Sequence, residues 1–204
     1  MAVNRWSESA DRPSGAEYAE RFTALARSGV DVHGEATLCA SLVPTGAHVL
    51  DAGCGTGRVA IRLTELGFVC VGVDSDRSML AEARRASDAV TWIEGDLADL
   101  DATALADASF DLVVMAGNVV PLLAVGTEAT AVGQVARRVV PGGLLVAGFG
   151  LDRAHLPPGA STIALDDYDI WCAAAGLIPA ARWSTWDEHA YTPDAGYAVS
   201  VHRR

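Results

Sequence analysis

Three glycines spaced by single residues follow an acid in the first third of the chain. They are Gly53, Gly55 and Gly57, and the acid is Asp51. Glycine lets the backbone approach a ligand closely, and open α/β sheets bind ligands at such a turn between a strand and a helix. Dinucleotide sites favour a different spacing, G-x-G-x-x-G, which frames a diphosphate at the start of a helix. The acid would sit poorly beside a diphosphate, so the pattern favours a cationic ligand.

Two further acids follow later apolar runs. Asp74 ends the run 71–74, and Asp96 follows Glu94 and Gly95. Each acid alone is as well explained as a helix cap or a turn former. Together with the glycine turn they favour a ligand site, because a carboxylate accepts both hydroxyls of a ribose. The α-ammonium and sulfonium charges of S-adenosylmethionine fit such a site better than a dinucleotide does.

The apolar periodicity predicts the elements that must position these residues. It alternates between short continuous runs and a period of about 3.6, which indicates β-α-β construction. Strands are predicted at 47–51, 69–74, 89–93, 110–115 and 144–149, and a terminal hairpin at 180–189 and 196–203. Helices are predicted at 15–28, 34–43, 58–66, from Asp76 onward, at 127–140 and at 166–175, with 1–14 and 151–165 as loops. The fold class is therefore α/β: a Rossmann-like, doubly wound, seven-stranded sheet in three αβα layers, mostly parallel with an antiparallel last strand.

The motifs in this order resemble a known family. Residues 49–57 resemble motif I of the class I S-adenosylmethionine-dependent methyltransferases, and 71–74, 94–97, 110–114 and 140–145 resemble its later motifs. The resemblance implies S-adenosyl-L-methionine as cofactor, S-adenosyl-L-homocysteine as product, ribose contact at Asp74 and adenine contact at Asp96. The full set of expected donor-binding residues is Asp51, Gly53, Cys54, Gly55, Asp74, Ser75, Met79, Asp96, Leu97, Ala116 and Gly117.

Residues that act on the acceptor are harder to identify. His33, Glu35, Asn118 and His155 are weak candidates, for a base or for substrate contact; Tyr18 and Arg21 could close over the donor. The segment 116–119 lacks the N/D-P-P-Y/F tetrapeptide of family members that methylate base or glutamine nitrogens. The prediction is methyl transfer to a small-molecule acceptor by in-line displacement. A nicotinamide-dependent oxidoreductase and a non-catalytic donor-binding module remain alternatives.

The amino-acid composition excludes several kinds of chemistry and of binding partner. The 204 residues include 15 arginines and no lysine, which excludes Schiff-base chemistry and a lysine-dependent phosphate loop, and the net charge of −11 disfavours nucleic acid and anionic membranes. No apolar run is long enough to span a membrane, and because the polar start lacks the apolar core of a signal peptide, none is expected. Four cysteines without metal-ligand spacing indicate reduced thiols in a cytoplasmic protein, and no metal is expected. We expect an N-terminal helical cap at 1–45 and one compact domain at 46–204, with no predicted oligomeric state.

Overall fold

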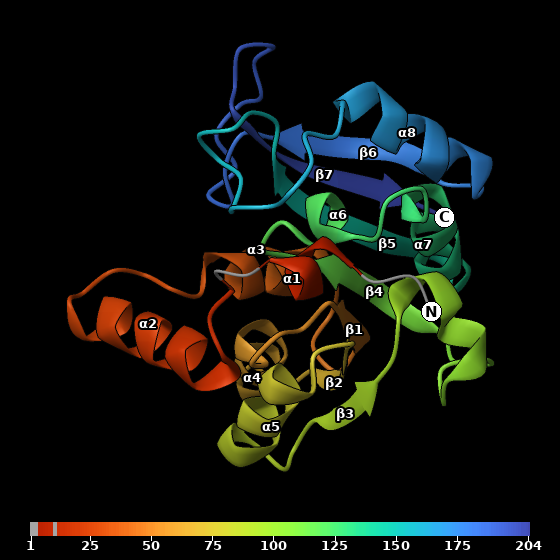
Figure 1. Cartoon of the computed structure of the whole chain (residues 1–204). Helices are drawn as coiled ribbons and strands as arrows, with labels where there is room; N and C mark the ends of the chain where they lie inside the picture. Colours follow the sequence, from red (N-terminus) through yellow and green to blue (C-terminus); the bar gives the residue numbers. More distant parts are fainter. Residues whose placement is uncertain (1–3, 10–11) are drawn as a thin grey trace.

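The sheet has seven strands in the order β3-β2-β1-β4-β5-β7-β6 (Figure 1). The computed structural model describes residues 4–9 and 12–204. The strands are β1 (His48–Ala52), β2 (Val69–Asp74), β3 (Thr91–Glu94), β4 (Phe110–Met115), β5 (Val139–Gly150), β6 (Ile178–Trp183) and β7 (Tyr197–Arg203). Neighbouring strands from β3 to β5 pair in parallel, and β7 is antiparallel to both β5 and β6. The predicted doubly wound α/β fold is confirmed.

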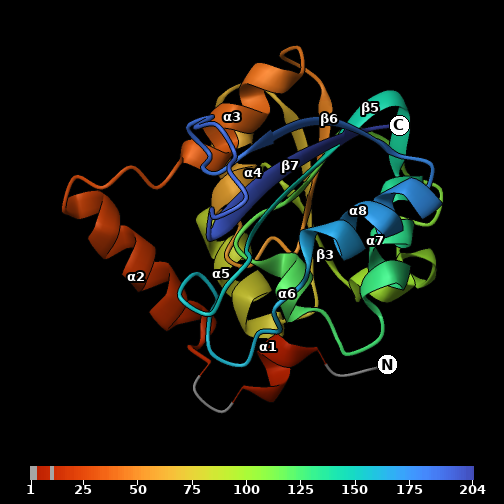
Figure 2. The same cartoon turned by 90° about the horizontal axis from the view of Figure 1, so that it is seen from above.

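Helices cover both faces of the sheet. Figure 2 shows α3 (Gly34–Leu42), α4 (Arg58–Glu65) and α5 (Arg77–Ala86) on one side, and α7 (Glu128–Arg137) with α8 (Leu165–Ala174) on the other. Successive strand side chains point to opposite faces, and β1 shows this: Val49 packs on the α3 and α4 side, whereas Leu50 packs on the α7 and α8 side. Both residues are fully buried, so β1 lies at the centre of the fold.

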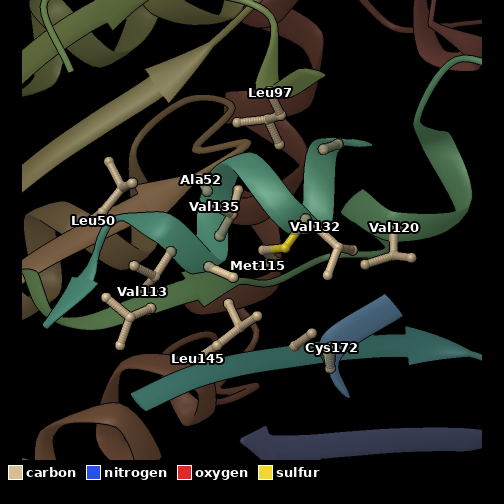
Figure 3. Packing of buried hydrophobic residues seen from close by; sticks show 14 of the residues in the cluster. Leu50, Ala52, Leu97, Val113, Met115, Val120, Val132, Val135, Leu145 and Cys172 are labelled. Carbon is tan, nitrogen blue, oxygen red and sulfur yellow. The ribbon is translucent and has the colours of Figure 1, made fainter. Parts of the chain in front are cut away.

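The core between the sheet and α7 is built from small and branched residues. Leu50 on β1, Val113 on β4 and Leu145 on β5 meet Val132 and Val135 of α7 (Figure 3). Burying each such side chain is worth about 1.5–3 kcal/mol. This packing fixes the central strands, and with them the loops that follow the strands.

The strand order reverses direction beside β1. The chain runs from β1 outward to β2 and β3, and then returns to the other side of β1 as β4. Ligands of open α/β sheets bind in the crevice at the carboxyl ends of the strands at such a switch point. The loops 53–57, 75–76, 95–97 and 116–118 follow β1 to β4 and all lie at this edge.

The prediction that 1–14 is a loop is wrong for part of its length. Arg5–Glu8 forms a short helix, α1, whose first turn is capped by the Asn4 side chain. This polar segment shows no apolar stripe from which a helix could be predicted. The helix is instead held by contacts with residues that are distant in the sequence. Helix α2 (Gly15–Arg27) follows and begins with a capping box of Ser14 and Glu17.

Several predicted bounds also needed correction. Strand β5 starts five residues before the predicted 144, because Val139 already pairs with Phe110 before the register shifts. Strand β6 ends at Trp183 instead of 189, and Glu188 beyond it adopts a left-handed φ of 60°. The short helices α6 (Val119–Leu122) and η1 (Leu97–Ala102) gave no periodic signal. The division between a cap at 1–45 and a domain at 46–204 stays a prediction. None of the described helices has the length and apolar character to cross a membrane.

Candidate functional site

A cavity opens at the carboxyl edge of the sheet, where the four loops meet. It holds about 950 Å³ of space not filled by protein, counting the part open to solvent. Every residue predicted from the sequence to bind a donor lines it. These residues are Asp51, Gly53, Cys54, Gly55, Asp74, Ser75, Met79, Asp96, Leu97, Ala116 and Gly117. The structure therefore brings together residues that are spread over 67 positions of the chain.

The glycine turn between β1 and α4 needs glycine for two different reasons. Gly53, Gly55 and Gly57 all have positive φ angles, of 80°, 53° and 82°. A Cβ on Gly53 would lie 2.6 Å from the Val119 side chain, and one on Gly57 would lie 2.3 Å from the Trp92 ring. A Cβ on Gly55 would meet nothing within 4 Å. The outer two glycines thus allow close packing, whereas the backbone at Gly55 faces open space that a ligand can fill.

Asp51 lies at the bottom of the cavity. Its residue is 2% exposed, and its carboxylate accepts a hydrogen bond of 3.1 Å from the backbone N–H of Ala60. Burial raises the pKa of Asp51 to about 7, against the opposing effects of that hydrogen bond and of the nearby Arg58 guanidinium. A cation placed in the cavity would restore the ionised form.

Asp74 is held at the end of β2 by the glycine turn itself. Its Oδ2 accepts from the Gly55 N–H at 2.8 Å, and its Oδ1 accepts from the Asp76 N–H at 2.8 Å. Burial raises its pKa above the ordinary aspartate value, while these backbone bonds oppose the shift. Each carboxylate oxygen keeps a second lone pair, which suits a diol. Asp96 lies one strand further along, where its side chain caps η1 through the Ala98 N–H at 2.9 Å.

The N-terminal segment supplies cavity residues that the sequence analysis missed. Asn4 and Trp6 line the cavity, although the segment was predicted to be a loop and neither residue was expected to bind the donor. Tyr18 of α2 also lines it, where it was expected to close over the donor, whereas the exposed Arg21 does not. Burial raises the pKa of Tyr18, so its phenol stays neutral. Val119, which was expected with 116–118 to line the methionine portion of the donor, also lines the cavity. The other lining residues, which were not predicted, are Thr56, Arg58, Val59, Gly95, Leu122 and Leu123.

None of the four weak candidates for acceptor chemistry is among the residues that line the cavity. Glu35 is engaged in a two-pronged ion pair with Arg58, at 2.5 and 2.7 Å. Arg58 also donates to the Val32 carbonyl and lies 4.6 Å from the centre of the Phe22 ring. Glu35 thus positions the one guanidinium among the described lining residues.

Asn118 and His155 form part of the loop framework. Asn118 has a left-handed φ of 66°, and its Oδ1 accepts from the Gly150 N–H at 2.7 Å while its Nδ2 donates to the His155 carbonyl at 3.3 Å. The exposed His155 ring pairs with Asp152 at 2.8 Å. His33 precedes α3, and its buried Nδ1 has no hydrogen-bond partner in the part of the chain that the structure describes. A catalytic role for any of these residues stays a prediction.

Residues 4–9 and 12–204 contain no group of three or more His, Cys, Asp or Glu side chains placed to hold a metal ion. The cavity residues offer instead a glycine turn, three carboxylates on successive strands and apolar walls. This set fits a ligand with a nucleoside and a cationic chain.

Comparison with known proteins agrees with this geometry. The profile of the methyltransferase domain family matches residues 49–143. The structure superposes on a TehB-like S-adenosylmethionine-dependent methyltransferase from Corynebacterium glutamicum with a TM-score of 0.83 and 30% identity, over 93% of this chain and 97% of that one. The chain belongs to the S-adenosylmethionine-dependent methyltransferases. The cofactor of this methyltransferase is therefore S-adenosylmethionine.

Two curated relatives match parts of this methyltransferase. The cypemycin N-terminal methyltransferase of a Streptomyces species is 39% identical over 101 residues, which are 48% of this chain and 40% of that protein. Mouse glycine N-methyltransferase is 31% identical over 173 residues, which are 74% of this chain and 59% of that protein. The chain thus spans less than two thirds of either relative. Family membership also leaves the nicotinamide-dependent alternative without support.

Proposed function

We propose that this methyltransferase transfers a methyl group from S-adenosylmethionine to a small-molecule acceptor by in-line displacement. The observation that carries the proposal is the meeting of Asp51, Asp74 and Asp96 in one cavity, at the ends of three successive parallel strands. Asp74 would accept the ribose hydroxyls, and Asp96 with Leu97 would hold the adenine edge. Asp51 would face the cationic chain, beside Ala116 and Gly117.

The chain has to align the reactants more than it has to transfer protons. Bound S-adenosylmethionine supplies a methyl carbon on a sulfonium, which is already activated toward a nucleophile. The residues around the cavity orient the nucleophile and exclude water, and such alignment can supply about 7–11 kcal/mol of the barrier. The apolar residues Val119, Leu122 and Leu123 line the same space and suit this role.

We infer an amine as the first acceptor class to test. The name of mouse glycine N-methyltransferase specifies methylation at nitrogen. An unprotonated amine brings its own lone pair, so it needs no base, and no histidine is among the lining residues described. We infer a small acceptor because the chain segments that surround the cavity and could bind an acceptor are short. The net charge of −11 argues against nucleic acid as acceptor, and four free, buried cysteines agree with the reducing cytoplasm.

Turnover tests the proposal directly. The purified protein would be incubated with S-adenosylmethionine and panels of small amines, alcohols and thiols, and formation of S-adenosylhomocysteine would be measured. We expect acceptor-dependent product with at least one amine. Binding of S-adenosylmethionine with no product from any panel would favour a non-catalytic donor-binding module. That second candidate rests on the position of His33, Glu35, Asn118 and His155 outside the lining.

A further inference from the structure

The N-terminal strap, defined here as residues 4–9, lies across the cavity and is fastened at both rims. Figure 1 shows its helix α1 between α6 and α5. On one rim the buried Arg5 guanidinium donates to the Leu123 carbonyl at 2.5 Å and to the Glu128 carboxylate at 2.8 Å. Both side chains of this ion pair are about one tenth exposed. A buried charge pair of this kind is costly to separate, so it anchors the strap.

The other rim is the loop between β2 and α5. The Asn4 Nδ2 donates to the Ser75 hydroxyl at 2.7 Å, and the Trp6 indole N–H donates to Asp76 Oδ2 at 2.9 Å. Asn4, Trp6 and Ser75 all line the cavity. The strap therefore forms part of the wall that a ligand in the cavity would touch.

Asp76 connects the strap to the donor site. Its Oδ2 accepts from Trp6 and from the Arg12 guanidinium, the latter at 2.8 Å, while its Oδ1 accepts from the N–H and the hydroxyl of Ser78 and caps α5. Its backbone N–H donates to Asp74 Oδ1 at 2.8 Å. Asp76 is 7% exposed, and these hydrogen bonds keep its pKa below the ordinary value despite burial. One residue thus fixes both the strap and the carboxylate of Asp74.

Aromatic rings continue the wall from the strap to α2. Trp6 and Tyr18 meet edge to face with ring centres 6.0 Å apart, and Tyr18 and Phe22 lie 5.0 Å apart. Trp6 and Tyr18 line the cavity that also contains the three carboxylates. Aromatic faces attract cations, so this wall and the acids suit the same charged ligand.

We propose that the N-terminal strap is the outer wall of the S-adenosylmethionine site, that Asn4 and Trp6 contact the bound donor, and that Asp76 is the residue that positions the strap over Asp74. The inference rests on the proposed donor site. Donor exchange then requires the strap to leave the β2–α5 loop, and a weaker attachment there speeds release of the product S-adenosylhomocysteine.

Variants on the strap side of Asp76 test this without removing the cap of α5. Trp6→Phe deletes the indole N–H and keeps a ring, and Arg12→Gln deletes the charge. Each loss of one hydrogen bond changes an equilibrium by about 2- to 12-fold. We expect the double variant to release S-adenosylhomocysteine about tenfold faster in stopped-flow measurements. Replacing Arg12 by lysine instead of glutamine should keep the release of S-adenosylhomocysteine slow, because Arg12→Lys keeps the positive charge beside Asp76.

The matched control is Arg77→Gln at the first residue of α5, directly after the same loop. Arg77 pairs with the exposed Glu94 at 2.7 Å and makes no hydrogen bond to the strap within the described residues. Its release rate should equal that of the wild type, and thermal unfolding without ligand verifies that each variant is folded. Wild-type release from a folded double variant would overturn the strap as a wall of the site. Failure of the wild type to bind S-adenosylhomocysteine at all would overturn the proposed function first.

Trypsin gives an independent measure of strap release. Arg5 is buried, whereas the Arg27 side chain on α2 is 72% exposed. Cleavage after Arg5, followed by mass spectrometry relative to cleavage after Arg27, reports how often the strap opens. S-adenosylhomocysteine should slow the first cut several-fold in the wild type and less in the double variant. An unchanged ratio of the two cuts on ligand binding would contradict the proposal.

Discussion

The two sides of the cavity differ in how the fold positions them. On the donor side, strands β1, β2 and β3 pair in parallel, so Asp51, Asp74 and Asp96 reach the same edge as soon as the sheet forms. On the opposite side, the strap is held by side-chain hydrogen bonds to residues 70 or more positions away. Helix α2 is held in the same long-range way, since the Gly15 N–H donates to the Ser78 hydroxyl 63 positions away. A sheet edge can therefore be inferred from local sequence, whereas a wall built by long-range contacts cannot.

The largest effect should come from Asp74 on the donor side. Both carboxylate oxygens of Asp74 accept hydrogen bonds of 2.8 Å from backbone N–H groups. Asp74→Asn removes the charge and replaces one of these acceptor oxygens by an NH₂ group, which cannot accept. The variant then holds the ribose and the glycine turn poorly. Charge-assisted hydrogen bonds are worth about 1.5–3 kcal/mol, so we expect the Kd for S-adenosylhomocysteine to rise about 100-fold, measured by calorimetry.

Asp99→Asn is the matched control for this change. Asp99 is an exposed acid on η1, outside the cavity lining. The Asp99→Asn substitution removes the same charge from the same edge of the molecule, and the Kd for S-adenosylhomocysteine should change less than twofold. Equal losses in the two variants would mean that general acidity, and not the contact at Asp74, governs donor binding.

The next effect concerns Asn118, which either contacts the acceptor, as its place after β4 suggests, or only braces the loop. Its left-handed φ of 66° and its bond to the Gly150 N–H favour the brace. Asn118→Ala loses the bonds and puts alanine in a left-handed conformation that asparagine tolerates better, while Asn118→Gly loses the bonds but adopts this conformation without strain. We expect free energies of unfolding lower by about 2 kcal/mol for Ala and about 1 kcal/mol for Gly, measured by urea denaturation.

A role in acceptor binding would give another pattern. Both variants would then lose turnover equally, with KM for the acceptor raised and stability unchanged. The contrast therefore assigns Asn118 to one of the two roles.

The donor side was predictable because its residues follow strands whose apolar runs are unmistakable. Asp51 and Asp74 end such runs, and the glycines between them have spacing that a turn alone does not need. Periodicity also identified helix α4, with Val59 and Leu63 buried as one stripe. These signals are local, so they need no knowledge of the partner elements.

The strap gave no such signal. Arg5 and Trp6 lie in a polar segment, and α1 is only four residues long. Their order depends on Glu128 and Asp76, which are 123 and 70 positions away. Glu35 illustrates the reverse error: an acid near the cavity looks available to chemistry until the fold pairs it with Arg58. Such pairings follow from the assembled sheet and helices, and not from spacing along the chain.

The smallest effect is the pH dependence of donor affinity, which should depend on Asp51 and not on the strap opposite it. Burial raises the pKa of Asp51 to about 7, well above its ordinary value of 3.8. Without ligand, the folded protein therefore binds a proton that the unfolded chain has released, and the free energy of unfolding falls as pH rises from about 4 to about 7. A cationic donor requires the ionised form, so calorimetric affinity for S-adenosylmethionine should rise about eightfold from pH 6 to pH 7.5. Asp51→Asn should flatten that slope, while Trp6→Phe should weaken binding equally at both pH values. A slope that survives Asp51→Asn would place the titrating group elsewhere, with the half-buried Asp74 as the next acid whose pKa is raised.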